Sequence, residues 1–173
     1  QRGTDMATLE FGAWGSVKHY DIENNYGGVA ADAYEEHIRQ ARLMDELGYK
    51  YYWIIEHQAS YVGAITSPTV FLTAVARATE QLHIGAMIWV LPFHNPIRLA
   101  EEIATLDHLS HGRVEFGTGL GTHEHEFIRM GLDYYARREM GEESLAIIER
   151  AWTQPEVKYK GRFWSFDEML PRP

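Results

Sequence analysis

Apolar residues follow two different periods along this chain. Short, nearly continuous apolar runs are rich in aromatic and β-branched residues, as in strands that a parallel sheet buries on both faces. Between these runs, apolar residues recur every three or four positions, which indicates amphipathic helices. The runs predict strands at 8–14, 49–55, 82–92 and 113–119, and the periodic segments predict helices at 31–48, 68–80, 96–110 and 137–152.

Capping and breaking residues support these limits. Asp32 is expected to cap the first helix, and Gly48 suits its end. Pro68 and Pro96 suit the first turns of the second and third helices. A hairpin is expected over 157–166, turning at Lys160-Gly161.

Strand and helix alternate four times, which predicts a parallel sheet with right-handed crossovers. Two α/β architectures have this pattern: an open doubly wound sheet, and part of an eight-stranded barrel. In both, the site forms where the carboxyl ends of the strands meet. Histidines and carboxylates follow several of these strands, as in Glu56-His57-Gln58, Phe93-His94 and His123–Glu126.

The stretch RVEFGTGLGTHEHEF, residues 113–127, combines three glycines with two His-Glu pairs. A dinucleotide loop requires Gly-x-Gly-x-x-Gly after the first strand, whereas here Thr122 stands at the third glycine position. Two other interpretations stay open: glycines that allow a tight turn and close packing, and glycines that let a flat ligand approach the backbone. We favour the flat ligand, because aromatic residues and histidines end the other strands.

Composition narrows the function further. The chain has 173 residues, no cysteine and a formal net charge of −9, which argues against a nucleic-acid or anionic-membrane surface. No apolar run approaches the roughly 18 residues that cross a bilayer, and no signal pattern opens the chain. We therefore expect a cytoplasmic protein with Met6 as its native start and residues 1–5 as a cloning remnant.

Several segments together resemble the bacterial luciferase-like, flavin-dependent monooxygenases. The matching pieces are WIIEHQ (53–58), GAMIWVLPFHNPIRLAEE (85–102), LDHLSHGRVEFGTGLG (106–121), Glu126-Phe127, EESLAIIERAWT (142–153) and GRFWSFDEMLPRP (161–173). The resemblance implies an α/β fold, the N-terminal half of a (β/α)8 barrel. Residues 6–173 would form that half of a single domain, with the C-terminal half absent.

The resemblance also implies an activity. Family members use O2 and reduced FMN, supplied by a separate flavin reductase, to oxygenate a small organic substrate, and they usually form homodimers. An F420-dependent oxidoreductase of the same fold and a non-catalytic flavin-binding protein are the alternatives. No metal is implied; His123 and His125 would share one side of an extended strand but would need a third ligand.

Site residues are carried over by position. His57 matches a histidine that acts in the flavin chemistry, and Glu126 matches an acidic residue near the site, so both are expected to be catalytic. Met87 and Ile88 match a non-proline cis peptide beneath the flavin ring. The full set expected to bind the cofactor is Trp14, Glu56, Met87, Ile88, Glu101, Thr118, Gly119 and Leu120.

Two departures from the family pattern bear on this set. Gly119 stands where luciferase has a reactive cysteine, and Leu120 stands where an arginine often meets the flavin phosphate. Gln58 replaces the second histidine of the strand-two motif. These differences favour a general monooxygenase over a light-emitting enzyme.

Overall fold

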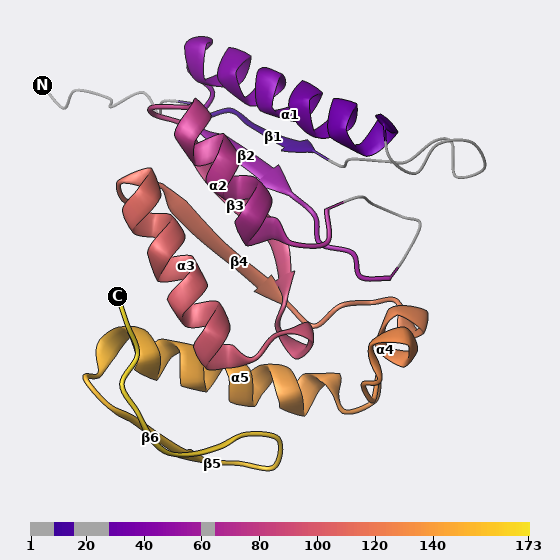
Figure 1. Cartoon of the computed structure of the whole chain (residues 1–173), viewed down its shortest axis with the longest axis vertical. Helices are drawn as coiled ribbons and strands as arrows, with labels where there is room; N and C mark the ends of the chain where they lie inside the picture. The colour runs from indigo at the N-terminus through magenta and orange to yellow at the C-terminus, as the bar shows by residue number, and fades with distance from the viewer. Residues whose placement is uncertain (1–8, 16–27, 60–64) are drawn as a thin grey trace, which may run out of the picture.

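The structure is a computed structural model, and it describes residues 9–15, 28–59 and 65–173 (Figure 1). The expectation for residues 1–5 lies outside the described residues. Within the described ranges, no helix is both long enough and apolar enough to cross a membrane.

Parallel strands form the central sheet in the order β1-β2-β3-β4. The strands are β1 (Gly12–Gly15), β2 (Tyr51–Ile54), β3 (His83–Val90) and β4 (Val114–Gly119). Each strand pairs with the next one along the chain, whereas a doubly wound sheet reverses direction part-way across. Sequential pairing with right-handed crossovers places the helices on one face, as in a barrel. The observed fold is therefore part of a barrel.

The four predicted helices and the hairpin are observed close to their predicted limits, whereas the short helix after β4 and the 3-10 turn after β3 were not predicted. The helices are α1 (Gly28–Glu46), α2 (Pro68–Ala78), α3 (Pro96–Ser110), α4 (Glu124–Met130) and α5 (Arg137–Thr153), with a 3-10 turn, η1 (Leu91–Phe93), after β3. An antiparallel hairpin, β5 (Val157–Lys160) and β6 (Ser165–Met169), lies beyond α5 in Figure 1.

One capping prediction was wrong. Helix α1 begins at Gly28, so Asp32 lies inside the helix and is not its cap. An unpredicted cap occurs at Asn95, whose side chain accepts the backbone N–H groups of Ile97 and Arg98, each at 3.1 Å. Gly48 follows α1 with a φ of +77°, as expected for the end of a helix.

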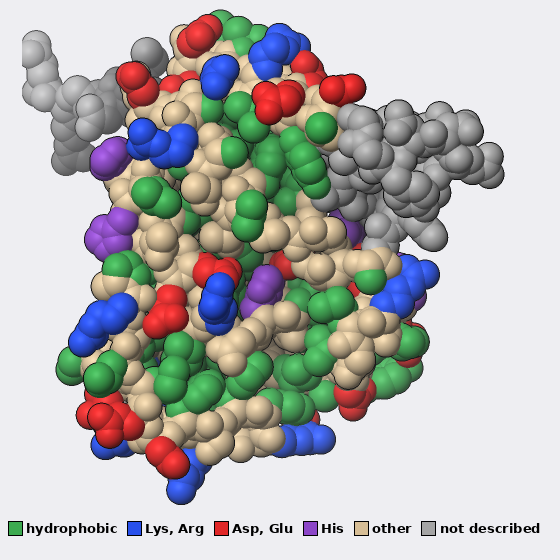
Figure 2. Space-filling model, in the orientation of Figure 1, with side chains coloured by type: hydrophobic (Ala, Val, Ile, Leu, Met, Phe, Trp, Pro, Cys, Tyr) green, Lys and Arg blue, Asp and Glu red, His purple; other side chains and the backbone are tan. Residues whose placement is uncertain are grey.

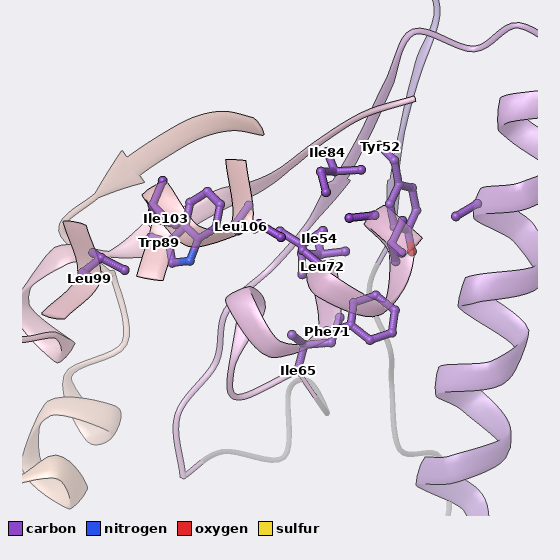
Figure 3. Packing of buried hydrophobic residues seen from close by; sticks show 14 of the residues in the cluster. Tyr52, Ile54, Ile65, Phe71, Leu72, Ile84, Trp89, Leu99, Ile103 and Leu106 are labelled. Atoms are coloured by element: carbon purple, nitrogen blue, oxygen red, sulfur yellow. The ribbon is translucent and has the colours of Figure 1, made fainter. Parts of the chain in front are cut away.

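One hydrophobic core joins the sheet to helices α1, α2, α3 and α5, and Figure 3 shows part of it. Along each strand, every second side chain points to this side. In β2, Tyr52 and Ile54 both point into the core, and the residue between them points away. The largest fully buried side chains of this core are Trp89, Ile54, Leu72, Leu82, Ile84, Leu99, Leu106, Ile148 and Val75. The helices therefore cover one face, which would be the outside of a barrel.

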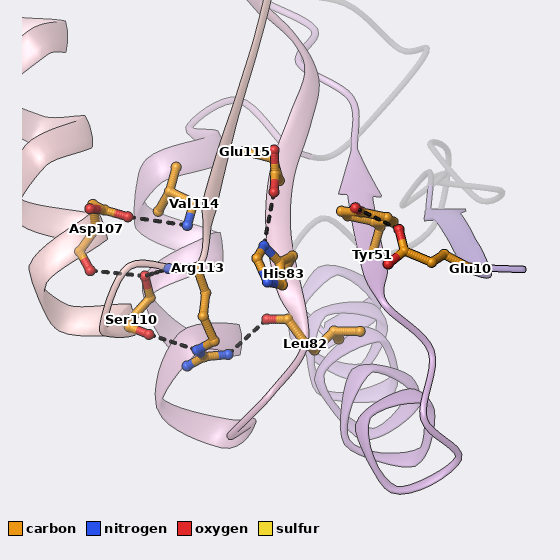
Figure 4. A network of polar contacts seen from close by, with 9 residues as sticks. All are labelled: Glu10, Tyr51, Leu82, His83, Asp107, Ser110, Arg113, Val114 and Glu115. Atoms are coloured by element: carbon orange, nitrogen blue, oxygen red, sulfur yellow. Dashed lines mark hydrogen bonds and ion pairs between the residues drawn. The ribbon is translucent and has the colours of Figure 1, made fainter. Parts of the chain in front are cut away.

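The opposite face of the sheet is open in the described part of the chain. Trp14 and Met87 have exposed fractions of 56% and 53%, which is high for strand residues. Near the amino ends of the strands, the Tyr51 hydroxyl donates to Glu10 at 3.0 Å, and His83 Nδ1 lies 2.8 Å from Glu115 Oε1 (Figure 4). This face corresponds to the interior of a barrel.

Charged residues on the outer surface are mixed in sign. On the face shown in Figure 2, Lys and Arg side chains are interspersed with Asp and Glu side chains. No basic patch gathers among the described residues of this face, which agrees with the net charge of −9. This face has no surface suited to nucleic acid.

Arg113 connects four segments at the amino ends of the strands (Figure 4). It is only 8% exposed, and burial lowers the pKa of its guanidinium. All of its N–H donors have acceptors, at 2.6 to 3.1 Å: the carbonyl oxygens of Ser110, Leu82, Ala76 and Thr79, and the hydroxyl of Thr79. The side chain therefore fixes the end of α2 and the end of α3 to the starts of β3 and β4.

Arg113→Ala should destabilise the protein by about 2–4 kcal/mol, because several buried carbonyl groups lose their donor at once. Urea unfolding followed by circular dichroism measures this change. Arg98→Ala is the matched control, since Arg98 lies on the surface and, among the described residues, forms an ion pair with Glu102 alone. Equal midpoints for the two variants would show that Arg113 does not stabilise this end of the fold.

Candidate active site

The polar residues that follow the strands meet at one end of the sheet, as the sequence predicts. Glu56 and His57 follow β2, and His94 follows η1. His123 and Glu126 lie at the start of α4, which comes after β4. Because the strands are parallel, their carboxyl ends share one edge, where sites form in α/β folds.

Glu56 is a buried carboxylate that accepts hydrogen bonds from several segments at the carboxyl end of the sheet. Its side chain has no exposed surface, and its carboxylate accepts the Val90 backbone N–H at 2.7 Å and the Gln58 amide at 2.8 Å. His94 Nε2 lies 2.8 Å from Oε1 and 3.0 Å from Oε2 of the same carboxylate. Glu56 therefore holds together the end of β2, the end of β3 and the loop before α3.

Sequence reasoning placed His94 at a strand end but not among the site residues. Its pairing with Glu56 spans 38 positions, so no local periodicity could reveal it. The only signal was the presence of one acidic and one imidazole side chain after neighbouring parallel strands. Such groups are brought to a common edge by the topology.

A second carboxylate–imidazole pair joins the two residues expected to be catalytic. His57 Nδ1 lies 2.9 Å from Glu126 Oε1, and the two side chains are 14% and 4% exposed. An ionised carboxylate only accepts hydrogen bonds, so a neutral His57 must carry its proton on Nδ1. Its Nε2 then has a free lone pair and can take up or deliver a proton.

The open face exposes two large apolar side chains. Trp14 of β1 and Met87 of β3 expose more than half of their surface there. The peptide bond between Met87 and Ile88 is cis, as the resemblance implied. The register between β3 and β4 shifts between Ala86 and Trp89, at the same place.

Close packing accounts for the strand glycines. A Cβ at Gly85 or Gly117 would meet the indole of Trp53, which lies across both positions, and at Gly117 it would overlap the Ala86 carbonyl oxygen. A Cβ at Gly119 would overlap Ile88 Cδ1. The interpretation that these glycines let a flat ligand approach the backbone is therefore not supported, because protein atoms occupy the space.

Three residues of the expected cofactor set lie elsewhere. Leu120 packs against Gly141 of α5. Thr118 alternates with Phe116, a core residue, and so points to the helix-covered face. Glu101 lies on α3 and accepts the backbone N–H of Arg172 at 3.3 Å, on the outer side of the fold. The structure brings none of the three to the open face.

A group with metal-binding side chains is present, but it is not the pair considered from sequence. His57, His123 and Glu126 each offer one ligand atom, and these atoms lie within 4.8 Å of one another. His125 does not belong to this group, although its ring lies 5.4 Å from that of His123. His57 follows β2, whereas His123 and Glu126 follow β4.

The sequence profile of the luciferase-like monooxygenases matches residues 11–173. The chain belongs to the luciferase-like monooxygenase family. It is 34% identical over 159 residues to 4-hydroxyprotoasukamycin monooxygenase of Streptomyces nodosus subsp. asukaensis, covering 92% of this chain and 42% of that protein. It is 31% identical over 147 residues to limonene 1,2-monooxygenase of Rhodococcus erythropolis, covering 84% of this chain and 36% of the relative.

Solved structures of two monooxygenases agree with the fold. Monooxygenase RslO1 from Streptomyces bottropensis has a TM-score of 0.87 and 27% identity, over 95% of this chain and 49% of the other. The oxygenating constituent of 3,6-diketocamphane monooxygenase from Pseudomonas putida, in complex with FMN, has a TM-score of 0.79 and 24% identity, over 91% and 43%. The chain thus spans about half or less of the length of these proteins.

The packing around the glycines predicts that two alanine substitutions reduce stability by different amounts. Gly117→Ala should destabilise the protein by about 1–3 kcal/mol, because the new methyl group meets the rigid backbone of β3. Gly119→Ala should cost less, because the terminal methyl group of Ile88 can rotate away. Urea unfolding of both variants checks the order, and a larger loss at Gly119 would contradict this account of the packing.

Proposed function

We propose that the protein is the oxygenating component of a flavin-dependent monooxygenase, which uses reduced FMN and O2 to oxygenate a small organic substrate. The observation that carries this proposal is the His57–Glu126 pair, nearly buried, at the edge of an open apolar face. Family membership supplies the reaction class, and the geometry supplies a group suited to proton transfer.

The residues at this end fit a flavin ring. The ring is flat and largely apolar, and Trp14 and Met87 offer exposed apolar surface on the open face. Ile88, beside Met87 in the cis peptide, belongs to the same segment of β3. We propose that these three residues contact the ring.

His57 would act on protons during the reaction. Reduced FMN, when bound, supplies the electrons that activate O2. Glu126 holds the Nδ1 proton of His57, so that Nε2 can accept a proton or, once protonated, deliver it. Glu56 would act indirectly, since it fixes the backbone next to His57 and orients His94.

Relatives support the cofactor and the partner. The diketocamphane enzyme was solved with FMN. A further relative, 29% identical over 142 residues, is the oxygenase component of a flavin-dependent trigonelline monooxygenase from Acinetobacter baylyi. An oxygenase component implies a separate component that reduces the flavin, so we include a flavin reductase as partner. We also retain the homodimer as part of the proposal.

Two alternative functions are each supported by an observation. An F420-dependent tetrahydromethanopterin reductase from Methanopyrus kandleri shares the fold, with a TM-score of 0.62 and 22% identity. A non-catalytic flavin-binding role would also use the apolar open face. A non-catalytic flavin-binding role needs no proton-transfer pair, and the relatives that use FMN or act as a flavin-dependent oxygenase favour the monooxygenase over the F420-dependent reductase.

Stopped-flow mixing of the protein and reduced FMN with O2 separates these functions. A monooxygenase should slow flavin reoxidation, show a transient absorbance unlike that of reduced or oxidised FMN, and incorporate one atom of labelled O2 into a product. A flavin-binding protein would bind FMN but leave its reoxidation rate unchanged. Binding of F420 in preference to FMN would favour the reductase.

His57→Ala should lower product formation per bound flavin by about 10²–10⁴-fold, because the proton donor and acceptor is lost. Product formation, reduced-FMN affinity and melting temperature are measured together. His125→Ala serves as control, since His125 lies outside the His57–Glu126 pair. If activity per bound flavin stays within about threefold while the melting temperature collapses, His57 is a structural residue.

A further inference from the structure

We propose that His57, His123 and Glu126 also form a binding site for a divalent transition-metal cation, with Zn²⁺ as the representative ion. The luciferase-like reaction does not require this ion. The site would instead be inhibitory, because a bound cation occupies the imidazole that the proposed function uses for proton transfer. The effect on turnover rests on the proposed function, whereas metal binding does not.

The ligand atoms are already close together. His57 Nδ1 and Glu126 Oε1 are 2.9 Å apart, which is close to the separation of two neighbouring ligands on one zinc ion. The three ligand atoms lie within 4.8 Å of one another, whereas two ligands on one tetrahedral zinc ion lie about 3.3 Å apart. The ligand atoms must therefore move closer together on binding. His123 is partly exposed, and its present contacts are the Thr122 hydroxyl, 3.3 Å from its Nδ1, and the rings of His57 and His125.

Glu126 gives the site its preference for a cation. Its side chain is 4% exposed, and among the described residues His57 is the only side chain that hydrogen-bonds to its carboxylate. A buried carboxylate with one partner is incompletely compensated for the loss of water, so a bound cation would stabilise it. The net charge of −9 adds a general attraction for cations.

The ligand types select the class of ion. Two imidazoles and one carboxylate suit Zn²⁺ and similar transition metals, whereas Mg²⁺ and Ca²⁺ prefer oxygen ligands. Three protein ligands leave at least one position for water on a four-coordinate ion. Binding through Nδ1 would displace the proton that His57 shares with Glu126, and the neutral imidazole would then carry that proton on Nε2, which could no longer accept one.

Zinc binding can be tested without flavin or substrate, so that a negative result is independent of the proposed function. The chain, freed of any purification tag, is titrated with Zn²⁺ against a colorimetric chelator, and Mg²⁺ is tested in parallel. We expect one Zn²⁺ per chain and no comparable binding of Mg²⁺. His123→Ala and Glu126→Gln should each weaken zinc binding by about tenfold or more.

His125→Ala is the matched control. It removes a neighbouring histidine, whose ring is 5.4 Å from that of His123, but leaves the three proposed ligands in place. It should change zinc affinity by less than about twofold. Circular dichroism confirms folding of each variant; if Glu126→Gln does not fold, the comparison of the two histidine variants decides.

The proposal is overturned by either of two results. One is the absence of stoichiometric Zn²⁺ binding at micromolar concentration. The other is equal weakening by His123→Ala and His125→Ala, which would indicate scattered histidine binding. In an active preparation, Zn²⁺ should also inhibit product formation, and His123→Ala should raise the Zn²⁺ concentration needed for half-inhibition.

Discussion

The buried carboxylate of Glu56 is the constraint on which the rest of the site depends. With no exposed surface, it must obtain its hydrogen bonds from the protein, and it does so from Val90, Gln58 and His94. These donors belong to the end of β3, the loop after β2 and the loop before α3. Satisfying one carboxylate therefore fixes the relative positions of three segments, and His57 lies directly beside it in the chain.

The two ends of the sheet use buried charge differently. At the amino ends, Arg113 bonds mostly to backbone carbonyl groups, and Asp45 accepts the N–H groups of residues 80–82 at 2.7 to 2.9 Å. These groups fix the chain, although one carboxylate–imidazole pair, His83–Glu115, also lies near this end. At the carboxyl ends, Glu56 and Glu126 each pair with a histidine, and Nε2 of His57 makes no hydrogen bond to another side chain among the described residues. The first arrangement stabilises the fold, and the second can act on a ligand.

Features that depend on local sequence were predictable, and features that depend on distant contacts were not. Hydrophobic period and proline placement predicted α3 at the limits observed, and strand–helix alternation predicted the parallel sheet. The packing around Gly117 and Gly119 was not predictable, because the neighbours that crowd them, the Ala86 carbonyl and the Ile88 side chain, belong to another strand. The His57–Glu126 contact spans 69 positions, and only the family resemblance suggested both residues. The cap at Asn95, in contrast, had a local signal directly before Pro96.

Glu126 links the proposed catalytic role to the proposed metal site. By accepting from Nδ1, it fixes the tautomer of His57 and leaves Nε2 open for proton transfer. The same buried negative charge, with a second imidazole within reach, favours a metal cation in place of that proton. Proton and cation compete for one carboxylate–imidazole pair. An enzyme with this pair would therefore function only where the free zinc concentration stays below the dissociation constant of the site. The position of the partly exposed His123 affects that dissociation constant, because His123 would be the third ligand.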